Sequence, residues 1–180
     1  MSTAFRIVSG GQTGVDRAAL DAALALGISI GGWCPRGRLS EAGPIPRRYR
    51  LQETPSRDYR QRTEWNVRDS DGTLIINSGS LNGGTLRTVR LARERYRKPL
   101  LIMQLGVRVR PGKFRAWLKV NRVRRLNVAG PRASKRVQIY KGALRLLLQL
   151  LDCRKEVRFS INVTSDSSQS NSHPYLKNER

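Results

Sequence analysis

The chain has 180 residues, 38% of them hydrophobic, and its 35 Lys and Arg against 13 Asp and Glu give a formal net charge of +22. This length excludes a multi-domain machine but allows one domain with its own core, which needs no disulfide or metal to hold it together. Two distant cysteines and one histidine argue against structural zinc, a disulfide scaffold and a His-based catalytic triad. Neither a signal peptide nor an apolar run of bilayer length is found, so the sequence predicts a cytoplasmic protein with no membrane partner.

The first part of the chain predicts strand, turn and helix in succession. Residues 4–9 are a short β-rich run that ends at two glycines. Residues 15–26 follow as an Ala/Leu-rich helix, which Gly27 ends. Residues 28–33 then predict a second strand, and the Gly- and Pro-rich residues 35–55 have the composition of a loop.

The same alternation continues in the second part of the chain. Further strands are predicted at 73–77, 99–105 and 125–129, and helices at 85–97, at 113–121 and from an N-cap at Ser134 to Asp152. Strands that alternate with helices of this length indicate the α/β class. We therefore predict a three-layer Rossmann-like fold, an open, mostly parallel sheet with helices on both faces.

The composition changes near residue 152. Residues 1–152 are predicted to be a single Rossmann-like ligand-binding domain, and residues 153–180 a polar tail. The tail begins with apolar residues at alternate positions, compatible with one edge strand: Val157, Phe159, Ile161 and Val163. Residues 165–180 are rich in Ser, Asn and Gln, which predicts disorder.

Three strand-to-helix turns carry the predicted binding site: residues 9–17, 77–85 and 127–135. Glycines in the first two allow close backbone approach, and amide groups at a helix start attract phosphate. The first turn is neither GxGxxG nor a Walker A loop. Turns on neighbouring parallel strands face one crevice where the strand order reverses. The predicted ligand- or phosphate-binding residues are Gly10, Gly11, Gln12, Thr13, Gly14, Arg17, Gly79, Ser80, Gly83, Gly84, Thr85, Gly130, Arg132 and Ser134.

Four carboxylates are candidate catalytic acids or bases: Asp16, Glu64, Asp69 and Asp71. The last three precede a buried strand, where capping and turn roles are the stronger interpretation. Asp16 lies beside the first glycines, where it would also stabilise the helix start. Trp33, Cys34 and Trp65 suggest stacking and metal ligation, but core packing is the better interpretation. Cys34 is therefore only a weak candidate metal ligand.

Four segments in the expected order resemble one known family: SGGQTGVDRAALDAAL, GGWCPRGR, RTEWNVRDSDGTLI continuing to GSLNGGT, and LNVAGPRAS. Over about residues 5–151 the chain resembles the molybdenum carrier family, a circularly permuted YpsA-like branch of the SLOG superfamily. The resemblance implies a Rossmann-like fold that binds a nucleotide-like or pterin phosphate. By the same resemblance, Gly10, Gly11, Thr13 and Gly14 match one ligand loop.

Gly83, Gly84 and Thr85 match the second loop of that family. Related phosphoribohydrolases carry a Glu one helical turn beyond this Gly-Thr pair, where this chain has Thr88. The third loop has Ala133 where the family has Glu. Both departures argue against that enzyme activity.

Three functions therefore remain open. The leading hypothesis is a carrier that binds a small anionic ligand, a molybdenum cofactor or a nucleotide. The first alternative is a hydrolase acting on a nucleotide derivative. The second is nucleic-acid binding by the stretch 106–145, which has cations but no Asp or Glu, although a general excess of arginine along the chain is the better explanation of the charge. The Leu-rich last helix also suggests a homo-oligomer.

Overall fold

The computed structural model describes residues 4–136 and 138–152. The strands of the main sheet are β1 (Arg6–Val8), β2 (Ser29–Gly31), β5 (Gly72–Asn77), β6 (Leu100–Gln104) and β7 (Arg125–Ala129). They form a parallel sheet in the order β2-β1-β7-β5-β6. A second, small parallel sheet joins β3 (Trp33–Cys34) to β4 (Gln52–Glu53).

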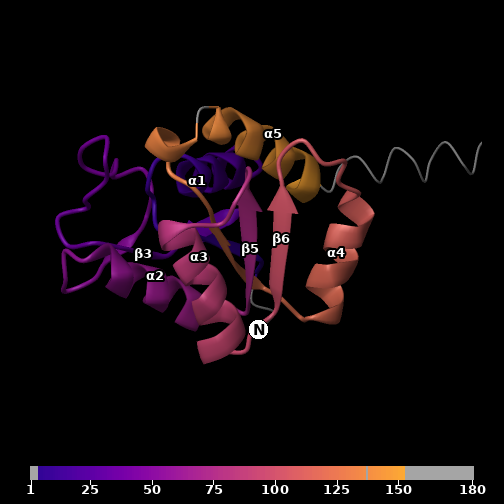
Figure 1. The fold of residues 1–180 in the computed structure, drawn as a ribbon, viewed down its shortest axis with the longest axis horizontal. Coiled ribbons are helices and arrows are strands. Elements are labelled where there is room, and N and C mark those ends of the chain that lie inside the picture. The colour runs from indigo at the N-terminus through magenta and orange to yellow at the C-terminus, as the bar shows by residue number, and fades with distance from the viewer. Residues whose placement is uncertain (1–3, 137, 153–180) are drawn as a thin grey trace, which may run out of the picture.

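Helices cover both faces of the main sheet (Figure 1). They are α1 (Val15–Ala25), α2 (Tyr59–Arg68), α3 (Gly83–Arg90), α4 (Pro111–Val120) and α5 (Ile139–Leu151), with a π-helical turn η1 (Leu91–Arg95) and a 3-10 turn η2 (Ala133–Lys135). Helix α1 packs along α5 on one face, while α2 packs against α3 and η1 on the other. The predicted α/β Rossmann-like class is confirmed.

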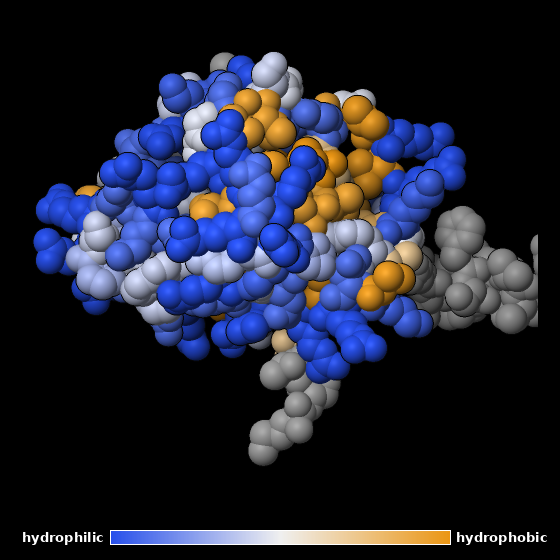
Figure 2. All heavy atoms as spheres, turned by 60° about the horizontal axis from the view of Figure 1, so that its bottom comes forward, coloured by the Kyte–Doolittle hydropathy of each residue, from blue (hydrophilic) through white to orange (hydrophobic). Residues whose placement is uncertain are grey.

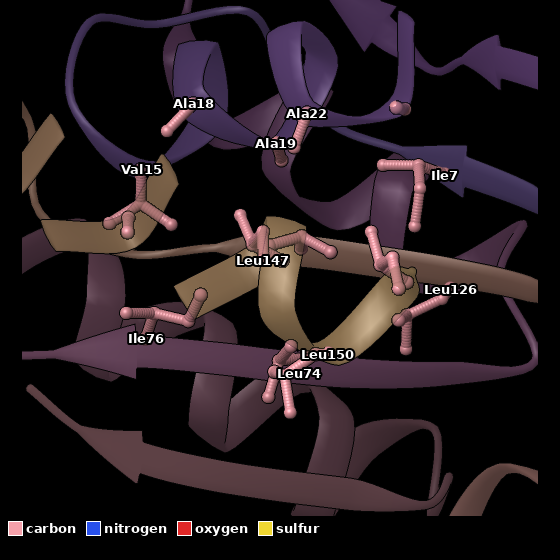
Figure 3. Close-up of a cluster of buried hydrophobic side chains, with 14 of the residues drawn as sticks. Ile7, Val15, Ala18, Ala19, Ala22, Leu74, Ile76, Leu126, Leu147 and Leu150 are labelled. Carbon is pink, nitrogen blue, oxygen red and sulfur yellow. The ribbon is translucent and has the colours of Figure 1, made fainter. Parts of the chain in front are cut away.

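The main core lies between the sheet and the α1–α5 layer. Leu74 and Ile76 alternate along β5 and face α5, whose Leu147 lies against the alanines of α1 (Figure 3). Small residues on that face of α1, Ala18 among them, allow the two helices to lie close together. Strand β5 is buried along its whole length, as expected for a strand covered on both faces.

The long loop between β3 and β4 is held by a cluster of its own. Its members are Leu20, Cys34, Ile45, Tyr49 and Leu51. The guanidinium of Arg38 organises the loop by donating hydrogen bonds to four of its carbonyl groups, those of Ile45, Pro46, Tyr49 and Leu51, over 2.8–3.2 Å. A segment with loop composition is thereby fixed against α1.

Several elements differ from the sequence prediction. The strand predicted at 28–33 is split between β2 and β3, which lie in different sheets, and β4 lies within the predicted loop 35–55. Helix α2 was not predicted, because its buried face includes the polar Thr63 and Asn66 beside Val67, and this masks the helical period. The predicted cap at Ser134 is wrong, since α5 begins at Ile139 after the separate turn η2. The predicted edge strand at 157–163 and the tail lie outside the described residues.

The packing of the main core predicts how far truncation of one buried side chain would lower the free energy of unfolding. Leu147 is completely buried among α1, α5 and the sheet, so Leu147→Ala should lower the free energy of unfolding by about 2–5 kcal/mol. Leu24→Ala on the exposed side of α1, where 44% of the residue is accessible, serves as the matched control and should change it by less than about 1 kcal/mol. Urea denaturation of both variants measures the difference, and equal losses would contradict this description of the core.

Candidate functional site

A cleft of about 190 Å³ opens at the carboxyl edge of the sheet, where β1, β7 and β5 are neighbours. Gln12 and Asp16 line it from the loop and helix after β1, and residues 129–132 line it from the loop after β7. The loop after β5 contributes residues 82–85. The three turns therefore meet at one crevice, as predicted. The remaining residues of the wall are Arg62, Thr63, Thr88 and Lys135.

The start of α3 is open to this cleft. A Cβ added to Gly83 or Gly84 would meet no atom within 4 Å. The first amide that closes a helical hydrogen bond there is that of Leu86, which donates to Asn82 O over 3.1 Å. Asn82 makes no side-chain cap, so the preceding amides point outward as donors with partial positive charge.

The glycines of the first loop have a different role from the predicted one. A Cβ on Gly10 would meet Arg62 Nη1 at 1.8 Å, and one on Gly11 would meet Leu51 at 2.7 Å. At Gly14 it would meet Pro131 O at 2.3 Å, and Val15 N already donates to that carbonyl. These three glycines allow the protein's own groups to approach and are not among the residues that line the cleft, so their predicted contact with a ligand stays a prediction.

Gln12 presents an unused donor to the cleft. Only 4% of the residue is accessible. Its Oε1 accepts hydrogen bonds from Thr13 N over 2.9 Å and from Glu41 N over 3.0 Å, which fixes the orientation of the amide. Its Nε2 has no hydrogen-bond partner among the described residues. A buried donor without an acceptor is costly, and an acceptor atom of a ligand would satisfy it.

Arg62 provides a second unused donor beside a buried carboxylate. Its Nη1 lies 3.0 Å from Asp16 Oδ2, and its buried Nε has no partner among the residues described. Burial raises the pKa of Asp16 above its ordinary value, although the Arg62 charge and a hydrogen bond from the Gln12 main chain act in the opposite direction. The Arg62 guanidinium and that of Arg132 both lie within 6 Å of the Tyr59 ring centroid, at 5.9 and 5.7 Å.

The third turn is held by the carboxylate of Glu41, which comes from the long loop. Glu41 accepts hydrogen bonds from Ser134 N over 3.2 Å, from Ser134 Oγ over 2.5 Å and from Thr13 Oγ1, and Arg132 Nη1 lies 3.7 Å away. Burial raises the pKa of Glu41, but these hydrogen bonds and the Arg132 charge outweigh it and hold the pKa below its usual range. Thr13 and Ser134, predicted to bind a ligand, thus bind a group of the chain itself.

Three further predicted residues lie outside the cleft wall. Arg17 donates to Gly11 O over 3.1 Å and lies 5.2 Å from the Tyr49 ring centroid. The Gly79 carbonyl accepts a hydrogen bond from Asn77 Nδ2 over 2.7 Å, and Ser80 follows it on the exposed part of the turn. Of the residues predicted to bind a ligand, those that line the cleft are Gln12, Gly83, Gly84, Thr85, Gly130 and Arg132.

The other candidate catalytic carboxylates do not line the cleft. Asp71 accepts hydrogen bonds from Arg125 N over 2.7 Å and from Arg124 N over 3.0 Å, at the amino ends of β5 and β7. Asp69 accepts one from Trp33 Nε1 over 2.7 Å. Glu64 lies 3.1 Å from Arg95 Nε and accepts a bond from Tyr96 Oη. Each of the three joins structural elements away from the cleft wall, whereas Asp16 lines it.

Cys34 and the two tryptophans pack as expected. Cys34 is fully buried with Ile45 and Leu51, and burial raises the pKa of its thiol, which disfavours the thiolate that a metal would need. Trp33 and Trp65 contact each other edge to face, 4.7 Å between centroids. Among residues 4–136 and 138–152, no group of three or more His, Cys, Asp or Glu side chains could hold a metal ion.

The sequence analysis missed several residues of the wall. Arg62 and Thr63 lie on the unpredicted helix α2, and Lys135 is the last residue of the third turn, where it was not predicted to bind. The signal for Arg62 and Thr63 was present in the segment RTEWNVRD, which was assigned to the family resemblance without a binding role. Glu41 gave no signal, because a single carboxylate in a long loop has no characteristic spacing.

Comparisons with known proteins show the family of this chain. Residues 7–151 match the circularly permutated YpsA SLOG family, and the chain belongs to that family. A crystal structure at 1.45 Å resolution of a protein from Syntrophus aciditrophicus SB, named "Putative molybdenum carrier protein", is 45% identical in sequence with a TM-score of 0.77. The match covers 84% of this chain and 96% of that chain. Among curated proteins none matches the sequence.

No helix within the described part of the chain has the length and hydropathy to cross a membrane.

The lowered pKa of Glu41 predicts how its contacts depend on pH. The stability that its ionised form contributes is complete above the ordinary value of 4.5 and is lost as the pH falls through the lower folded value. Glu41→Gln should therefore cost about 1 kcal/mol of unfolding free energy at pH 7, and the difference from wild type should fade below pH 4.5.

Urea denaturation across this pH range measures that difference. Glu94→Gln, on the exposed part of η1, is the control and should show no such trend. A Glu41→Gln penalty that persists unchanged in acid would mean that the charge has no part in the contact.

Proposed function

We propose that this protein binds a small phosphorylated ligand, whose phosphate lies at the start of α3 in the cleft. The observation that carries the proposal is the open helix start at Gly83 and Gly84, in a cleft that Gln12 also lines and whose buried Gln12 Nε2 has no partner among the described residues. Amide donors with partial positive charge are suited to an anion. Arg132 and Lys135 add full positive charge to the wall.

The groups around the cleft suit an anion with further acceptor atoms. Asp16 is the one carboxylate among the lining residues, and Arg62 neutralises it over 3.0 Å. The remaining polar groups are mainly donors: the α3 amides, Gln12 Nε2 and Arg62 Nε. Charge-assisted hydrogen bonds to phosphate are stronger than neutral ones. The site would hold the phosphate by these donors and offer its two buried side-chain donors to oxygen or nitrogen acceptors nearby.

The size of the cleft indicates how much of a ligand it would enclose. Its volume of about 190 Å³ is below the roughly 300–1,000 Å³ of pockets that bury a drug-sized molecule. A phosphate and an adjoining sugar-sized group would be enclosed, and the rest of the ligand would extend over the rim. A nucleotide or a phosphorylated pterin has this shape, and both are consistent with the carrier name of the similar crystal structure.

The side chains that line the cleft include no soft ligand for molybdenum. Neither a cysteine nor a histidine lies among the residues that line the cleft, and Cys34 packs in a separate apolar cluster. The lining residues therefore suit the phosphate of such a ligand and not its metal. Molybdenum carried here would bring its own metal ligands, and the protein would hold the cargo through its phosphate and its other acceptor atoms.

A matched pair of glycines tests the phosphate site. Gly84 and Gly112 both occupy the second position of a helix, and a Cβ on either meets no atom within 4 Å. Gly84→Val should weaken binding by about 10–100-fold, since its methyl groups would displace a charge-assisted hydrogen bond, whereas Gly112→Val on α4 should not.

Calorimetric titration with AMP at 150 mM salt measures the affinity, and adenosine shows what the phosphate contributes. Equal AMP affinity in the two variants would contradict the proposed site. Native mass spectrometry of freshly purified protein, with an absorbance scan, identifies any nucleotide, pterin or molybdenum species that remains bound.

A hydrolase is the second candidate, because Asp16 lies in the cleft wall with a raised pKa that suits proton transfer. Its pairing with Arg62 and the presence of Thr88 in place of the related Glu favour binding without turnover. We therefore expect wild type to release no more base or phosphate from AMP than Asp16→Asn does. Product analysis by chromatography measures this, with circular dichroism as the folding control, and release by wild type alone would support the hydrolase.

A further inference from the structure

An apolar groove of about 420 Å³ lies at the amino edge of the sheet, the end opposite the cleft. Figure 2 faces this edge and shows apolar side chains gathered in a hollow with hydrophilic surface around it. Its apolar lining includes Phe5, Leu26, Ile28, Phe114, Leu118 and Leu150. Four of these, Phe5, Leu26, Ile28 and Leu118, are only partly buried although they pack against the main core.

The position of the groove relative to the chain suggests its occupant. Helix α5 ends at Leu151, and Asp152, the last residue that the structure describes, is itself part of the groove wall. The sequence continues directly from that wall into residues 153–180. Any apolar segment that follows within a few residues is therefore tethered beside the groove.

The sequence supplies such a segment. Apolar side chains occur at alternate positions from 157 to 163: Val157, Phe159, Ile161 and Val163. In an extended chain alternate side chains point to one side, so these would present a single apolar face. Val157 is the fifth residue after Asp152, and an extended chain of five residues spans up to about 17 Å.

We propose that residues 157–163 occupy the groove with their apolar side chains against Phe5, Ile28 and Leu118. A short tether gives the segment an effective concentration of about millimolar, far above that of a separate molecule at working concentrations. A second copy of the chain carries the same net charge of +22, and this repulsion opposes its approach. The chain's own segment is thus the occupant that the geometry and charge favour.

Disulfide trapping in the full chain tests the proposal. The background carries Cys153→Ser, and Cys34 stays buried. Leu118→Cys combined with Phe159→Cys should form an intramolecular disulfide about tenfold faster than Leu118→Cys combined with Ser168→Cys, because only residue 159 would be held at the groove. Intact mass and non-reducing electrophoresis separate the products. Equal rates, or a disulfide-linked dimer as the main product, would overturn the proposal.

Hydrogen exchange gives a second measurement that needs no new bond. Phe159→Asp would place a charge in the groove, so exchange of the α4 amides at 114–118 and binding of an apolar fluorescent dye should both increase. Ser168→Asp adds the same charge outside the proposed segment and should change neither. If both variants behave like wild type, the segment does not cover the groove.

Discussion

The parallel pairing of β7 between β1 and β5 is the constraint on which the site depends. Residues 6–8 pair with 125–127, and residues 72–75 pair with 126–129, so the last strand of the described residues lies in the middle of the sheet. A hydrogen bond from Asn127 Nδ2 to Thr73 Oγ1, over 3.3 Å, joins the side chains of β7 and β5. Because all strands run the same way, the loops after β1, β7 and β5 meet at one edge.

The glycines at that edge have two physically different roles. Gly14 and Gly130 lie where backbone meets backbone: a Cβ on Gly130 would meet Ile76 O at 2.2 Å. They allow the three turns to approach one another. Gly83 and Gly84 instead leave space beside the α3 amides. Sequence resemblance to other ligand loops does not distinguish these two roles, because a glycine occurs in the sequence in either case.

The charge of the cleft depends on a few ion-paired side chains around its wall. The net charge of the whole chain predicts the charge of the cleft less well. Asp16 and Glu41 are each matched with arginine in or beside the wall, Asp16 with Arg62 and Glu41 with Arg132. Gln12 is fixed by the main chain of Glu41, so the long loop takes part in the site as well as covering the first turn. Nucleic-acid binding by residues 106–145 and a homo-oligomer through α5 remain predictions.

The sequence by itself determined the fold class, the five main strands and the three turns, because alternating apolar runs and glycine breaks are local signals of strands and their ends. It also indicated Gly83, Gly84 and Arg132 correctly as parts of one crevice. The tertiary structure alone decided which glycines face the cleft, that Asp71 lies at the opposite edge, and that Arg62 and Glu41 belong to the site. Those facts depend on contacts between residues far apart in the chain, and no local pattern encodes them.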